Sequence, residues 1–114
     1  MHRVLIVGRM APGAEERIAK ILGESDGTEL SGVTGVRHRS LYRLDDLCLH
    51  LMETPDADPA RLARAEGHPL FRAVTEALAN YVSPYSPNWR SPRDAMARCF
   101  YRWDAPAPVT GTAR

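Results

Sequence analysis

The sequence lacks any excess of charge, has few cysteines and contains no long apolar run. It carries 15 lysines and arginines against 14 aspartates and glutamates in 114 residues, a net charge of +1. A balance so near zero gives no electrostatic footprint for nucleic acid or an anionic membrane. No apolar run approaches the ~20 residues of a membrane-spanning helix, and residues 4–7 are too short for the core of a signal peptide. We therefore expect a cytoplasmic protein that binds neither nucleic acid nor membrane.

The two cysteines also argue against several classes of site. Cys48 and Cys99 form no CxxC pair and no Cys/His cluster at ligand spacing, so no metal site is expected. Both fall within expected strands, where a free thiol acts as a small apolar core residue. The sequence also has no phosphate-binding glycine loop and no Ser/His/Asp ordering. We expect neither a bound metal nor a cofactor.

The order of elements indicates one α+β domain, residues 1–104, followed by a disordered tail, residues 105–114. A chain of this length buries a core without disulfide or metal. The expected elements are a strand at 4–10, a helix at 14–25, a connecting stretch at 28–34, a hairpin at 35–53, helices beginning at Pro59 and Pro69, a proline-rich loop at 83–92 and a last strand at 94–103. This order is the ferredoxin-like split βαβ plan, with four antiparallel strands and helices on one face. The bare face would expose too much apolar surface for a monomer, so we expect a homodimer of the dimeric α/β-barrel type.

The hairpin is the most informative segment. Asp45 and Asp46 suit a two-residue turn between flanks of alternating polarity, which pairs Leu41 with His50. Side chains alternate between faces, so Arg39 and His50 share one face, about 6–8 Å apart across the ladder. Two groups of this kind could bind one small ligand, although a solvated strand face with no function explains the pattern equally well.

Short motifs spread over the chain resemble the tetracenomycin-type aromatic polyketide cyclases. They are residues 24–30 (ESDGTEL), 35–41 (GVRHRSL), 46–51 (DLCLHL), 68–71 (HPLF), 81–85 (YVSPY), Trp89, 94–97 (DAMA) and 100–103 (FYRW). The resemblance implies a dimeric, ferredoxin-like protein of a type II polyketide pathway. Such a protein closes a late ring on a poly-β-keto chain by aldol condensation and dehydration, without metal or organic cofactor. It also implies Asp26, Arg39 and His50 as site residues, while Ser25 stands where the family's type member has a histidine.

These residue types fit the chemistry of ring closure. With a pKa near its reference value of about 6.5, His50 could serve as base and then acid near neutral pH. The permanent charge of Arg39 could stabilise an enolate or alkoxide. Asp26 could orient His50 or relay a proton, and a salt bridge to an arginine is an equally good explanation for it.

Four further residues are candidates for substrate binding: Ser25, His68, Tyr85 and Trp89. His68 precedes Pro69 and suits a helix start better than a cavity wall. Tyr85 and Trp89 lie in the proline-rich loop and could form an aromatic lid or simply pack in the core.

Two other functions remain open. Small ferredoxin-like dimers of antibiotic pathways also include cofactor-independent monooxygenases that oxidise anthrones, and oxygen dependence separates these from cyclases. A non-catalytic subunit could instead bind the nascent polyketide and prevent wrong closures. The substrate could arrive free or tethered to a carrier protein.

Overall fold

The hairpin forms with the expected register. In the computed structural model, which describes residues 1–90 and 92–107, β2 (His38–Leu44) pairs antiparallel with β3 (Leu47–Thr54). Leu41 lies opposite His50, and Arg39 lies opposite Met52. Asp45 has a φ of 52°, in the left-handed region that a two-residue turn requires and that aspartate tolerates. The turn and register expected from the alternation are thus confirmed.

The central strand is β1 (His2–Met10), which pairs with β3 on one side. Its other side pairs with two short strands, β4 (Val82–Ser83) and β5 (Met96–Ala97). The sheet order is β2-β3-β1-β4, with β5 also beside β1. Gly8 allows β4 to approach closely, because a Cβ there would lie 2.8 Å from Cγ1 of Val82.

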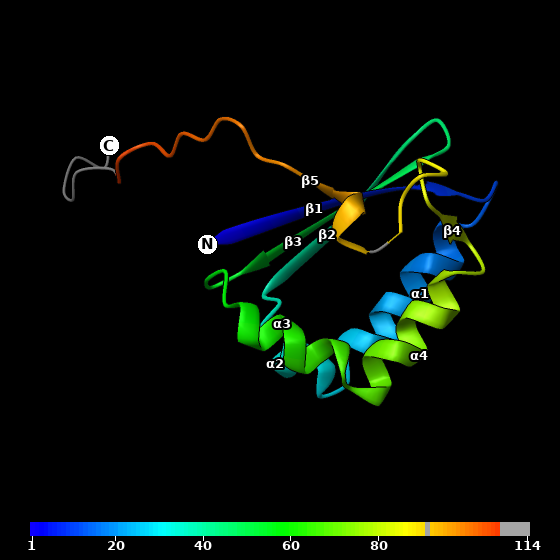
Figure 1. Cartoon of the computed structure of the whole chain (residues 1–114), viewed down its shortest axis with the longest axis horizontal. Helices are drawn as coiled ribbons and strands as arrows, with labels where there is room; N and C mark the ends of the chain where they lie inside the picture. The colour runs from blue at the N-terminus through cyan, green and yellow to red at the C-terminus, as the bar shows by residue number, and fades with distance from the viewer. Residues whose placement is uncertain (91, 108–114) are drawn as a thin grey trace, which may run out of the picture.

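The expected last strand, residues 94–103, is wrong in most of its length. A short 3₁₀ helix, η1 (Pro92–Ala95), comes first, and the strand has only two residues. Ala97 lies opposite Leu5, so an antiparallel continuation would pass the first residue of β1 within about four residues. Residues 98–107 lack regular structure and run away from the sheet (Figure 1). Of the expected tail, residues 105–107 are exposed and irregular, and residues 108–114 lie outside the described residues.

The helices lie together on one side of the sheet (Figure 1). They are α1 (Glu15–Asp26), α2 (Leu30–Thr34), α3 (Pro59–Glu66) and α4 (Pro69–Leu78). Asp58 Oδ1 accepts from the Ala60 amide at 3.0 Å, which starts α3 as the Asp-Pro pair predicts. The short α2 was expected to be a plain connection. Thr28 Oγ1 accepts from the Leu30 amide at 3.2 Å at its start, and Gly35 ends it with a φ of 77°.

The core lies between α1 and one face of the sheet. Met10, Ile18, Leu22 and Cys48 are buried there with Ala14. The α+β class with an antiparallel sheet is confirmed. Among the described residues no helix is long and apolar enough to cross a membrane.

The two cysteines differ in environment. Cys48 is buried in the core as expected, whereas Cys99 is exposed. The expectation for Cys99 is wrong because the last strand ends at Ala97 and leaves this residue beyond the sheet. Both thiols are free.

The opposite face of the sheet has no helical layer. Tyr42 and Leu44 point to this face by alternation, and they are 56% and 59% exposed. The aromatic side chains of Phe100, Tyr101 and Trp103 are also largely exposed along the irregular segment. The chain thus presents an apolar surface that its own helices leave uncovered.

Candidate active site

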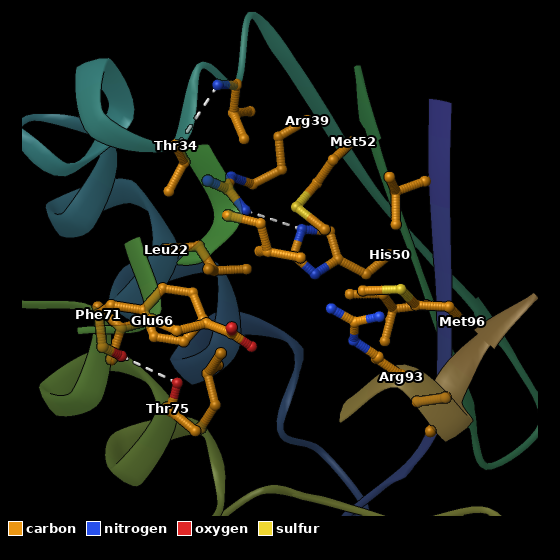
Figure 2. A pocket seen from close by; sticks show the side chains of 18 of the residues that line it. Leu22, Thr34, Arg39, His50, Met52, Glu66, Phe71, Thr75, Arg93 and Met96 are labelled. Atoms are coloured by element: carbon orange, nitrogen blue, oxygen red, sulfur yellow. Dashed lines mark hydrogen bonds between the residues drawn. The ribbon is translucent and has the colours of Figure 1, made fainter. Parts of the chain in front are cut away.

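A cavity of about 850 Å³ lies between the helices and the covered face of the sheet. Its walls are mostly apolar and include Ile6. Leu22, Met52, Phe71 and Met96 also line it (Figure 2). This volume and this character are typical of a site that binds a small organic molecule.

Three polar side chains form a connected row, and two of them lie in the cavity wall. Arg39 Nη1 donates to Nε2 of His50 at 2.9 Å, and both residues line the cavity. Arg39 Nη2 and Nε donate to the Asp26 carboxylate, at 2.9 Å for Nη2 to Oδ1. The Asp26 side chain is 42% exposed, against 16% for Arg39, and Asp26 is not part of the cavity wall. Asp26, the last residue of α1, therefore contacts Arg39 from outside, and no direct bond to His50 is formed.

The electrostatics of His50 differ from the sequence expectation. Burial, with a further contribution from the Arg39 charge, lowers the pKa of His50 to about 4, while the Asp26 charge opposes this shift. The expected value near 6.5 is wrong because the ring loses most of its water in the cavity. His50 is thus neutral around pH 7.

The contact with Arg39 also decides which ring nitrogen of His50 holds the proton. A guanidinium has no lone pair to offer, so Nε2 must accept and the proton of the neutral ring lies on Nδ1. The Nδ1 side of the ring faces the part of the cavity that contains Arg93 (Figure 2). His50 therefore presents a hydrogen-bond donor to a bound molecule.

The other four sequence candidates are divided between the cavity and its surroundings. Ser25 is buried and lines the cavity, and Trp89 lines it too. Tyr85 is 47% exposed outside the wall, where its ring packs on Trp89 at 5.9 Å and beneath the Arg9 guanidinium at 4.7 Å. His68 is absent from the wall: its Nδ1 accepts from the Leu70 amide at 3.1 Å and so caps α4.

Two of the charged wall residues that sequence reasoning missed are Glu66 and Arg93. Glu66, at the end of α3, and Arg93, in η1, line the cavity and point into it (Figure 2). Neither stands in a motif or at a strand position that pairs it with the hairpin, so no sequence signal identified them. Within the part of the chain that the structure describes, no group of three or more His, Cys, Asp or Glu could hold a metal ion.

Fold and cavity together define a small α+β protein whose antiparallel sheet and helices enclose a mostly apolar site with a few polar groups. Comparison with known proteins then narrows the class. The polyketide synthesis cyclase family matches residues 2–104. The chain therefore belongs to the polyketide synthesis cyclase family, as the motifs indicated.

Individual relatives agree with this assignment. An uncharacterized protein of Streptomyces coelicolor is 56% identical over 107 residues, covering 91% of this chain and 96% of that protein. Polyketide synthase CurG of Streptomyces cyaneus is 45% identical over 105 residues, 91% and 98% of the two chains. Tetracenomycin F2 cyclase of Streptomyces glaucescens is 43% identical over 105 residues, 92% and 96% of the two chains. Its solved structure superposes with a TM-score of 0.86 at 42% identity, covering 93% of this chain and all of that one.

Proposed function

We propose that the chain is a cofactor-independent aromatic polyketide cyclase of a type II pathway. It closes a ring of a poly-β-keto intermediate by aldol condensation and dehydration. The observation that carries this proposal is the Asp26–Arg39–His50 row at the wall of an apolar cavity of about 850 Å³. The similarity to tetracenomycin F2 cyclase supports the same substrate class.

The row suits the stabilisation of negative charge on oxygen. An aldol closure moves an electron pair first onto an enolate oxygen and then onto an alkoxide. Asp26 holds Arg39 in place, and Arg39 holds the His50 ring with its Nδ1–H available to the cavity. A donor already fixed in a cavity of low polarity stabilises such an oxyanion strongly, because little reorganisation is needed when the charge forms.

The hydrogen bond from Arg39 to His50 limits the role of His50 as a base. Its Nε2 lone pair is engaged with Arg39, so accepting a substrate proton there requires Arg39 to move away. We therefore assign His50 as a hydrogen-bond donor through its Nδ1–H, kept neutral mainly by burial, and Arg39 as the group that orients its ring. Asp26 is a positioning residue that acts through Arg39.

The apolar walls contribute by folding the chain. A flexible poly-β-ketone has several possible closures, and a shaped cavity brings one pair of carbons together, which can supply much of the acceleration. Trp89 offers a flat surface to an aromatic ring. Ser25 supplies a hydroxyl at the wall but no base, which separates this chain from the type member of the family.

We further propose that the protein is a ferredoxin-like homodimer. The sheet face with Tyr42 and Leu44 lacks a helical cover, and the exposed aromatics of residues 100–103 extend the apolar surface. A second copy that packs on this face removes both from water.

Reconstitution with a minimal synthase tests the cyclase proposal. Adding the protein should shift products from spontaneous shunt compounds to one cyclised aromatic product. Offering the same polyketide free and on a carrier protein shows which form is the substrate. Product formation that stops without oxygen would favour the monooxygenase, and an unchanged profile in a variant lacking both Arg39 and His50 would favour a non-catalytic subunit.

A further inference from the structure

Two exposed charged residues of the cavity wall have no partner within the described residues. Glu66 lies at the end of α3 and Arg93 in η1, and neither takes part in a hydrogen bond or an ion pair there. The other carboxylates of the wall are satisfied. Asp56 pairs with Arg61 at 2.8 Å, and Asp58 accepts from the Ala60 amide at 3.0 Å. Among the described residues of the cavity wall, Glu66 is therefore the carboxylate that is available to a bound molecule.

Among the arginines of the described cavity wall, Arg93 is the one whose side chain is free of an ion pair there and points towards His50. Arg39 is engaged with Asp26, and Arg61 with Asp56. Arg90 also lines the cavity without an ion pair in the described chain, but it is Arg93 that points from η1 towards His50 (Figure 2). Arg93 lies on the side of the ring away from Arg39, where Nδ1 is found, so two donors face one region of the cavity.

An aldol closure needs a proton acceptor as well as donors. The structure leaves His50 as a donor, because its Nε2 is engaged with Arg39. The Glu66 carboxylate projects into the same cavity from the helical wall, opposite Arg93 on η1 (Figure 2). A carboxylate on one side and paired donors on the other is the arrangement that enolisation of a ketone requires.

We propose that Glu66 is the general base of the reaction and that Arg93, with the Nδ1–H of His50, binds the enolate oxygen. This proposal rests on the proposed cyclase function and extends it to a specific class of substrate, a flat aryl 1,3-diketone that binds as its enolate.

In the first step a methylene C–H bond breaks and the proton moves to a carboxylate oxygen of Glu66. The released electron pair forms the C=C bond, and the carbonyl π pair moves onto the oxygen held by Arg93 and His50. The pair on the enolate oxygen then re-forms its carbonyl, the C=C π pair makes the bond to a second carbonyl carbon, and the π pair of that second carbonyl moves onto its own oxygen as an alkoxide. The resulting alkoxide takes the proton back from Glu66, which restores the carboxylate and leaves the aldol.

Enolisation can be measured apart from ring closure with benzoylacetone, a small aryl 1,3-diketone. NMR follows the exchange of its methylene hydrogens for deuterium above the buffer rate. Glu66→Gln should lower the protein-catalysed rate by about 100-fold or more, and Glu66→Asp should retain part of it. The matched control is Glu76→Gln on α4, an exposed residue outside the wall, which should leave the rate unchanged.

Arg93 is tested by the ionisation of the bound probe, followed by its ultraviolet spectrum. Wild-type protein should lower the pKa of the bound enol, and Arg93→Met should raise it again by about one unit or more, with tenfold weaker enolate binding. Arg93→Lys should restore part of the shift. The control is Arg98→Met, which should behave as wild type. Arg98 is exposed, follows β5 and lies outside the cavity wall.

Either the exchange experiment or the ionisation experiment can overturn the proposal. Exchange at the wild-type rate in Glu66→Gln removes the base role, and an unchanged probe pKa in Arg93→Met removes the enolate site. A wild-type protein that cyclises polyketide in the reconstituted synthase but does not enolise the probe also contradicts it. Failure of the cyclase proposal looks different, because the product profile then stays the same when wild-type protein is added.

Discussion

Acid should destabilise this protein through His50. Burial and the Arg39 charge lower the pKa of the folded residue to about 4, whereas the unfolded chain keeps the ordinary value of about 6.5. As the pH falls, the unfolded chain binds the proton first. The stability linked to the neutral ring is therefore fully present above about pH 6.5 and is lost as the pH falls towards 4.

The size of the effect follows from the two pKa values. Each unit of pKa difference corresponds to 1.36 kcal/mol, so the linkage removes about 2 kcal/mol at pH 5 and about 3 kcal/mol at pH 4. Urea unfolding at pH 7, 5 and 4 measures the loss. Acid also weakens ion pairs by protonating their carboxylates. His50→Gln isolates the contribution of the histidine to the loss of stability, because this variant keeps the carboxylates and lacks the titrating ring.

We expect the wild-type protein to lose about 2 kcal/mol more than His50→Gln between pH 7 and 5. A direct NMR titration of the ring should give a midpoint near 4. Arg39→Gln should raise that midpoint but leave it below 6.5, since burial is the larger cause. Equal acid losses in wild type and His50→Gln, with a midpoint near 6.5, would refute the argument. Turnover that depends on neutral His50 should accordingly stay flat between pH 5 and 8.

Further predictions concern activity, packing and assembly. His50→Ala or Arg39→Ala should lower cyclisation by roughly 10–1000-fold in the reconstituted assay, and wild-type rates in both would leave neither a catalytic role. Activity should survive chelators and strict exclusion of oxygen, measured as product yield. Gly8→Ala should cost about 1–3 kcal/mol by denaturant unfolding, because its Cβ would meet β4 at 2.8 Å, whereas Gly23→Ala has open space and should not destabilise. Light scattering at micromolar concentration should give a dimer mass that Tyr42→Lys lowers towards the monomer; a monomeric wild type contradicts the dimer.

Local patterns in the sequence were sufficient for much of the fold. The hairpin register follows from strict alternation around two aspartates, since a one-residue slip would turn every apolar side chain to the wrong face. The starts of α3 and α4 follow from a capping residue before a proline, because both effects act within a few residues. The same alternation predicted that Arg39 and His50 share one face, where both now line the cavity.

Long-range packing decided the rest. The last strand stops at Ala97, which no local pattern in residues 94–103 reveals. The pKa of His50 depends on how much water the folded cavity excludes, and the presence of Glu66 and Arg93 in the same cavity wall depends on where α3 and η1 pack. Spacing along the chain determines which side chains share a strand face, but only the assembled layers determine which charges face one another across a cavity and how strongly they interact.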